Sequence, residues 1–293
     1  VFDRDNENVQ HKLRLPAGPY YRYADDSLDK TSQVAVVGSG LAAASACLAL
    51  VKRGISTTLY FNGDTLASGA SGNPQGGFYP QLHSEASIAS RIQAHSFLYA
   101  RQRYDHTIEN VKANGLTSVA HDFCGVIQLS FNDKVAERQN KLAAADVWPE
   151  ALIKPVDSKE VSDIANLPLP YSGLYIGLGG WLSPPQLVTA MIEEALQSGK
   201  LELKPNHTYV SHEAVETTKK RVRIRFNLDS AESEEVITAD HLILALGAGA
   251  VNASDFDSLS LRPVRGQVEA IPTQMPIEQL NTVLCHKGYM KPV

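Results

Sequence analysis

Hydrophobic and polar positions fall into blocks along this chain, and the first blocks predict a strand, a turn and a helix. The apolar run VAVV at 34–37 is followed by glycines and then by the small-residue segment LAAASACLALV, which ends close to Gly54. A short apolar run before glycine is typical of a buried strand, and the longer small-residue segment is typical of a packed helix that stops at a glycine. A second strand is expected directly afterwards, at 56–61.

The later blocks alternate in the same way between the apolar spacing of helices and that of strands. Further helices are expected at 85–111, 133–147 and 183–199, and further strands at 125–131, 221–228 and 235–247. Two stretches show neither the helical nor the strand spacing. Residues 67–80 (ASGASGNPQGGFYP) are so rich in Gly, Ser and Pro that they predict either a functional loop or a disordered one, and the polar residues 1–32 indicate an interdomain linker.

Charge and cysteine content exclude several classes of protein. The net charge of −5 gives no overall basic field for nucleic acid. In KKRVRIR the arginines alternate with Val222 and Ile224, which predicts the solvated face of a strand. Three widely separated cysteines without a C-x-x-C pair argue against a zinc site or a disulfide framework and favour the reducing cytoplasm. No apolar run reaches the ~20 residues that a membrane span requires.

The glycine turn after the first strand has the spacing of a dinucleotide-binding site. Gly38 permits a tight strand-to-helix turn, Gly40 lets the backbone approach a diphosphate, and Ala43 keeps the helix close to the strand. The acidic residue expected at the end of the second strand is replaced by Asn62, with Asp64 two positions later. Either side chain is a candidate for the ribose hydroxyls.

Four later segments distinguish a flavin from a nicotinamide cofactor. They are GASGNPQGG (69–77), GGWLSPPQL (179–187), ADHLILALGAG (239–249) and RPVRGQV (262–268). In order and spacing they resemble the D-amino-acid-oxidase and glycine-oxidase superfamily. The resemblance implies FAD as cofactor and a mixed α/β fold, in which a Rossmann-like FAD-binding subdomain is interleaved with an antiparallel-sheet substrate subdomain. It implies FAD-binding parts at about 33–90 and 180–260, and substrate parts at about 91–179 and 261–293.

The site follows from the motifs and the resemblance together. The residues expected at the cofactor are Gly38, Ser39, Gly40, Leu41, Ala42, Ala43, Asn62, Asp64, Ser71, Gly72, Asn73, Gln75, Gly76, Gly77, Val210, Ala245, Gly247 and Gly266. Arg265 is the candidate for binding a substrate carboxylate, because a guanidinium can donate two parallel hydrogen bonds to a carboxylate. Tyr79 is the candidate for lining the substrate cavity, and Trp181 is expected to pack under the flavin-side turn. No metal site is expected.

A narrower resemblance suggests the substrate. The segments at 69–82, 123–131, 179–187 and 283–292 look like those of the FAD domain in bifunctional tRNA 5-methylaminomethyl-2-thiouridine biosynthesis proteins. That family implies oxidative removal of the carboxymethyl group from carboxymethylaminomethyl-uridine at the tRNA wobble position, with a methyltransferase domain on the same polypeptide. Both ends of this chain are therefore expected to be cut from a longer protein. Two alternatives stay open, a small-molecule amine or amino-acid oxidase and a non-catalytic nucleotide-binding domain.

Overall fold

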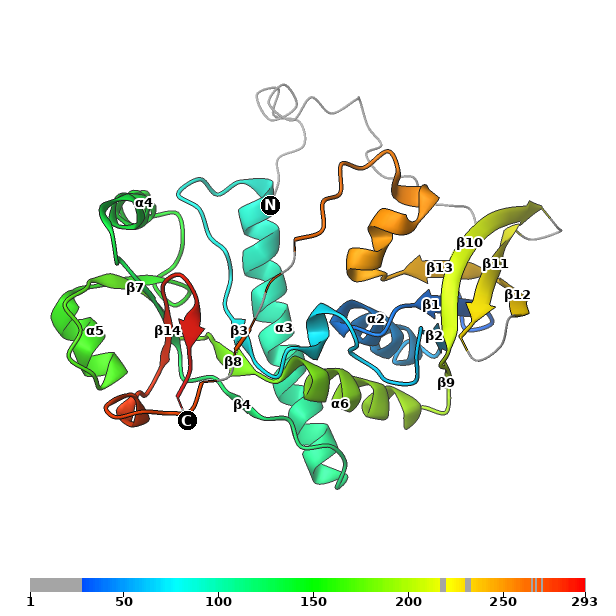
Figure 1. Cartoon of the computed structure of the whole chain (residues 1–293), viewed down its shortest axis with the longest axis horizontal. Helices are drawn as coiled ribbons and strands as arrows, with labels where there is room; N and C mark the ends of the chain where they lie inside the picture. Colours follow the sequence, from blue (N-terminus) through cyan, green and yellow to red (C-terminus); the bar gives the residue numbers. More distant parts are fainter. Residues whose placement is uncertain are drawn as a thin grey trace.

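The computed structural model describes residues 28–216, 220–229, 233–264, 266, 268–269 and 271–292 (Figure 1). The linker predicted for residues 1–32 lies almost entirely outside these ranges. Within the described part of the chain, no helix has the length and apolar character needed to cross a bilayer.

A four-stranded parallel sheet forms the base of the expected nucleotide site. Its order is β13 (His241–Leu244), β1 (Gln33–Val37), β2 (Ser56–Tyr60) and β9 (Leu201–Lys204). Side chains of β1 point alternately to its two faces. Val34 and Val36 therefore enter a different core from Ala35 and Val37.

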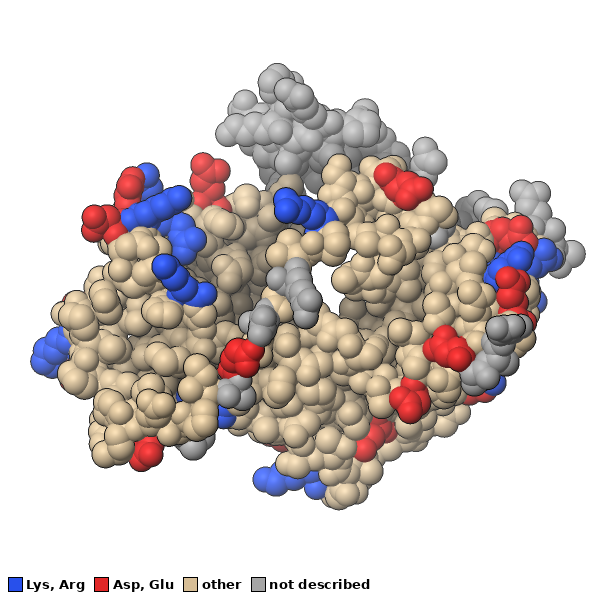
Figure 2. Space-filling view, viewed as in Figure 1, with Lys and Arg blue, Asp and Glu red and all other residues tan. Residues whose placement is uncertain are grey.

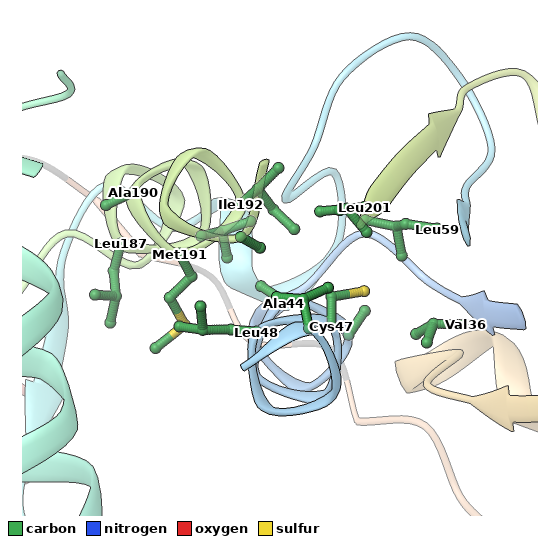
Figure 3. Close-up of a cluster of buried hydrophobic side chains, with 14 of the residues drawn as sticks. Val36, Ala44, Cys47, Leu48, Leu59, Leu187, Ala190, Met191, Ile192 and Leu201 are labelled. Carbon is green, nitrogen blue, oxygen red and sulfur yellow. The ribbon is translucent and has the colours of Figure 1, made fainter. Parts of the chain in front are cut away.

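Two helices cover one face of this sheet, and Figure 3 shows their packing. They are α2 (Leu41–Val51) and α6 (Pro184–Leu196), whose buried residues include Leu48 and Met191. Pro184 opens α6 at a position where a missing N–H costs nothing. The strand–turn–helix–strand unit predicted for residues 34–61 is confirmed.

A three-stranded antiparallel sheet covers the opposite face. It consists of β10 (His207–Glu216), β11 (Lys220–Leu228) and β12 (Ser233–Ala239). Ile224 and Phe226 are fully buried against the parallel sheet. The alternating arginines point outward and pair with acids, as Arg223 does with Glu213 at 2.8 Å. The prediction of a solvated strand face is confirmed.

The apolar run at 235–247 does not form the single strand predicted for it. It is divided at Asp240 into β12 and β13, which belong to different sheets. Asp240 accepts the N–H of Gln33 at 2.8 Å, and its own N–H donates to the Gln33 carbonyl at 3.0 Å. A charged residue anchors the chain where it changes sheets, and apolar periodicity alone does not reveal that corner.

The second region is a five-stranded sheet of order β15-β14-β5-β7-β6. Its elements are β5 (Val126–Leu129), α4 (Asp133–Ala144), β6 (Lys154–Val156), α5 (Ser158–Ala165), β7 (Gly173–Ile176), β14 (Val283–Cys285) and β15 (Tyr289–Met290). Three of its four pairings are antiparallel, and β14 runs parallel to β5. The expected antiparallel subdomain is thus a mixed sheet.

A long helix and a small sheet connect the two regions (Figure 1). Helix α3 (Ile88–Ala113) contributes Ile108 and Val111 to the core around α2, and Ala94 and Phe97 to the core of the second region. The small antiparallel sheet has the order β3 (Gly76–Phe78), β8 (Gly180–Leu182), β4 (His121–Asp122). Short 3-10 turns complete the fold, namely η1 (Ala70–Gly72), η2 (Gly247–Asn252), η3 (Ser254–Phe256) and η4 (Ile277–Gln279).

Candidate functional site

Gly38 forms the turn at the carboxyl end of β1. Its N–H donates to the Tyr60 carbonyl at 2.9 Å, and the N–H of Ala245 donates to the Val37 carbonyl at 2.8 Å. The φ of Gly38 is +138°, and a Cβ at this position would overlap the carbonyl oxygen of Ala245. Only glycine fits, so β2 and β13 hold the turn tightly on both sides.

Gly40 caps the start of α2 and leaves it open to an anion. The cap makes no side-chain hydrogen bond, and the first turn of α2 contains no acidic residue. The N–H of Leu41 donates to the Ser71 hydroxyl at 3.1 Å. The next two N–H groups, of Ala42 and Ala43, have no acceptor within the helix because they belong to its first turn. These donors fit a diphosphate group.

The Gly/Ser-rich loop lies directly on this turn. The N–H of Ala67 donates to the Ser39 carbonyl at 2.7 Å, and the Ser39 and Ser68 hydroxyls lie 3.1 Å apart. A Cβ on Gly40 would lie 2.9 Å from the Ser71 hydroxyl oxygen, and one on Gly72 would lie 2.6 Å from the Ala67 carbonyl oxygen. These contacts order the loop, which contradicts the disordered alternative.

The end of the same loop joins the segment at 179–187. As β3, it pairs with β8, so that Gly76 lies opposite Leu182 and Gly77 opposite Trp181. The Tyr289 hydroxyl donates to the Gln75 carbonyl at 2.5 Å. Segments separated by more than 200 residues are therefore in contact at one place, between the two regions. In Figure 2 an opening is visible in the middle of the molecule.

Aromatic side chains surround this junction. A Cβ on Gly77 would lie 3.1 Å from the Tyr79 ring and 3.9 Å from the Tyr289 ring. Burial, together with the neighbouring Cys285, raises the pKa of Tyr79 to about 12. Trp181 is only 9% exposed and packs in the same core cluster as Phe78.

The two candidates for binding the ribose hydroxyls of the cofactor, Asn62 and Asp64, lie on an exposed loop after β2. Neither Asn62 nor Asp64 bonds another side chain in the described part of the chain. The loop is positioned by Asp229, which accepts the N–H of Gly63 at 2.7 Å and the Thr208 hydroxyl at 2.6 Å. These two hydrogen bonds lower the pKa of Asp229. The sequence interpretation missed this residue, because a carboxylate in a hairpin turn carries no local signal of what it will reach.

The remaining predicted site residues are more scattered. Asn73 donates to the Ala70 carbonyl at 3.1 Å, and Gly247, with φ of +56°, begins η2 just after Ala245. Val210 is exposed at a bulge of β10. Gly266 is exposed, and a Cβ there would meet nothing within 4 Å. Arg265 lies outside the described residues. No cluster of three or more His, Cys, Asp or Glu side chains that could hold a metal ion occurs in the described ranges.

Comparisons with known proteins agree with this geometry. A family model for FAD dependent oxidoreductases matches residues 33–292. The chain is 42% identical over 282 residues to the tRNA 5-methylaminomethyl-2-thiouridine biosynthesis bifunctional protein MnmC of Pseudoalteromonas atlantica, covering 92% of this chain and 39% of that protein. It is 36% identical to the protein of the same name from Aeromonas salmonicida, covering 98% of this chain and 40% of that protein. The chain thus spans about two fifths of the length of these curated relatives.

Solved structures show the same fold at low sequence identity. Glycine oxidase from Geobacillus kaustophilus superposes with a TM-score of 0.64 at 18% identity, covering 89% of this chain and 69% of that one. Iminodiacetate oxidase from Chelativorans sp. BNC1 superposes with a TM-score of 0.54 at 18% identity, covering 75% of this chain and 56% of that one. The family model matches residues 33–292, nearly the whole described chain, and this match shows that the protein belongs to the FAD dependent oxidoreductase family, a family of enzymes.

Proposed function

We propose that this chain is the oxidoreductase part of a tRNA-modifying protein and removes the carboxymethyl group from carboxymethylaminomethyl-(2-thio)uridine at the wobble position. The observation that carries the proposal is the 42% identity to the Pseudoalteromonas protein along 92% of the chain. The name of that relative specifies both a tRNA nucleoside and a bifunctional polypeptide. A methyltransferase domain on the same polypeptide would then methylate the product, and the reaction would take place where tRNA is found, in the cytoplasm.

The cofactor proposed for this chemistry is FAD. The turn at Gly38 and the open start of α2 at Gly40 would hold its diphosphate, and Asn62 or Asp64 would bind its ribose. The loop residues 71–77 would follow the cofactor toward the junction with β8. When bound, FAD supplies the acceptor for the hydride that leaves the α-carbon of the carboxymethyl group.

The other steps of the reaction depend on the side chains of the protein and on water. The substrate nitrogen must be neutral so that its lone pair can form the carbon–nitrogen double bond as the hydride leaves. Water then adds to this imine and releases the aminomethyl-uridine and glyoxylate, which balances the reaction. Exclusion of bulk water before that step is a task for the buried ring of Trp181 and the half-buried rings of Tyr79 and Tyr289.

The fold comparison favours a second candidate, a small-molecule amine oxidase. Glycine oxidase shares the fold over 89% of this chain, and its name specifies a free amino acid. The two functions use the same chemistry and differ in the size of the substrate. A closed pocket would favour the free amino acid, and an open one would favour a nucleotide in tRNA.

A direct test is to incubate the FAD-loaded protein with tRNA that retains carboxymethylaminomethyl-uridine and, in parallel, with glycine and sarcosine. Nucleoside mass spectrometry should show the loss of the carboxymethyl group, and the tRNA turnover should exceed that of either amino acid. Rapid oxidation of glycine or sarcosine with unchanged tRNA would replace the proposal with the second candidate.

A further inference from the structure

Trp181 carries a polar group that the protein leaves unpaired. Its indole N–H finds no acceptor in the described part of the structure, although the residue is only 9% exposed. A buried donor without a partner destabilises the fold, because it has lost its hydrogen bonds to water without replacing them. An unpaired buried donor calls for a partner such as water, an ion or a ligand, so the N–H indicates an acceptor from outside the described residues.

Lys291 places a positive charge on the same ring. Its Nζ lies 3.8 Å from the centroid of the Trp181 ring. The ring face attracts the ammonium but does not neutralise it. None of the ion pairs found among the described residues includes Lys291, whereas Lys52 and Arg103 both reach Glu194, and Arg223 reaches Glu213. Lys291 is thus a partly buried cation without a carboxylate partner in the described ranges.

The position of this pair connects it to the proposed chemistry. Trp181 lies opposite Gly77 in the β3–β8 pairing, at the end of the loop that would follow the cofactor. Lys291 is two residues beyond Tyr289, whose hydroxyl donates to the Gln75 carbonyl. A group bound by the two free donors would therefore lie beside the junction at which the loop ends.

We propose that Lys291 and the Trp181 indole N–H form a carboxylate-binding site that holds the carboxymethyl group of the amine substrate. The ammonium supplies charge, and the indole N–H supplies a directed hydrogen bond, and a carboxylate accepts both. The identity of the substrate rests on the proposed function, whereas the preference for a carboxylate rests on the two unpaired donors. Lys291 is in this account a specificity-determining residue.

The site can be probed without cofactor or tRNA, because the chain has only two tryptophans. In a Trp148→Phe background, the fluorescence of Trp181 reports on its surroundings. The 293-residue chain is titrated with N-acetylglycine, which carries a carboxymethyl group on an amide nitrogen that cannot be oxidised in this way. N-acetylglycinamide serves as the matched neutral probe and inorganic phosphate as a competing anion, all at constant ionic strength.

The proposal predicts a saturable change with N-acetylglycine and none with the amide. Lys291→Met keeps an apolar stem over the ring but removes the charge, and should weaken binding roughly 10- to 100-fold. Lys291→Arg should retain binding within a few-fold, and circular dichroism checks that both variants fold. Equal binding of the amide, tighter binding of phosphate, or an unchanged affinity in Lys291→Met would each overturn the site. Because no turnover is measured, failure of the tRNA assay leaves this result intact, and failure here leaves the tRNA assay intact.

Discussion

The two ends of helix α2 are built in opposite ways. At its start, Ala42 and Ala43 present backbone N–H groups that have no acceptor within the helix, beside a turn in which a Cβ on Gly38 would collide with the Ala245 carbonyl. At its end, Lys52 pairs with the buried carboxylate of Glu194, which also binds Arg103 at 2.8 Å and the Thr107 hydroxyl at 2.7 Å. One end is left open and the other is closed by its own side chains.

The difference indicates which end serves binding and which serves stability. A buried charge whose hydrogen bonds are all satisfied holds α2, α3 and α6 together and has no capacity left for a ligand. An open helix start is stable enough only because the first-turn donors can face water or an anion. Substitutions at the two ends should therefore separate cofactor affinity from the free energy of unfolding.

The largest effect is expected for Gly38→Ala, which should damage both properties. The added methyl collides with the Ala245 carbonyl and forces a φ of +138° on an ordinary residue. We expect a loss of about 3 kcal/mol in the free energy of unfolding, measured in urea, and no detectable binding of FAD. Gly63→Ala is the matched control, because Gly63 also has a positive φ, of +67°, but open space around it. It should cost only about 1 kcal/mol. Equal losses in the two variants would refute the argument from the collision.

Glu194→Gln should affect stability alone. Burial by itself raises the pKa of Glu194, but hydrogen bonds from Lys52 and Thr107 and the charge of Arg103 outweigh it, so the net pKa is lowered. A carboxylate with a lowered pKa stabilises the fold above its unfolded-state pKa, and this contribution disappears as pH falls through the folded-state value. The substitution should cost about 2 kcal/mol at pH 7. The difference from the wild type should shrink below about pH 4.

Two readouts complete that experiment. FAD affinity should be unchanged in Glu194→Gln, because the carboxylate lies at the closed end of α2. Glu137→Gln removes an exposed partner of Lys141 and should leave the unfolding curve where it is. A loss of FAD affinity in Glu194→Gln that exceeds the loss of folded protein would show that the two ends are coupled.

Gly40→Ala should give the smallest change and should affect mainly binding. The new Cβ would lie 2.9 Å from the Ser71 hydroxyl, a side-chain atom that can rotate away. We expect roughly a tenfold loss of FAD affinity, measured by titration, because the methyl stands where the diphosphate approaches. Adding Ser71→Ala should remove any strain in the fold without restoring the affinity. Full recovery of affinity in the double variant would show that the strain, and not the approach of the diphosphate, was the cause.

The open end of α2 was predictable from the sequence, and the closed end was not. Gly38, Gly40 and the strand before them follow a spacing that backbone geometry dictates, so a local pattern suffices. Glu194 depends on Arg103 and Lys52, which are distant in the chain, and no periodicity relates them. The same limit applies to Asp229 under the loop at Gly63.

Secondary structure was missed for comparable reasons. The strands β9 and β10, at 201–204 and 207–216, mix charged and apolar residues because one face of each meets solvent or a neighbouring layer. Helix α5 (Ser158–Ala165) is only two turns long, although Asp157 and Glu160 form a capping box that could have revealed it. The strand predicted within 235–247 divides at Asp240 because that residue bonds Gln33 in another sheet. Tertiary contacts decide each of these cases.

The central claim is that the turn at Gly38 and the start of α2 bind the diphosphate of FAD. The most direct measurement is a titration of the wild-type chain and of Gly38→Ala with FAD, followed by flavin fluorescence, with riboflavin as the ligand that lacks a diphosphate. The account predicts saturable one-to-one binding of FAD to the wild type, much weaker binding of riboflavin, and no binding of FAD to the variant. Equal binding of FAD and riboflavin, or an unaltered FAD affinity in Gly38→Ala, would contradict it.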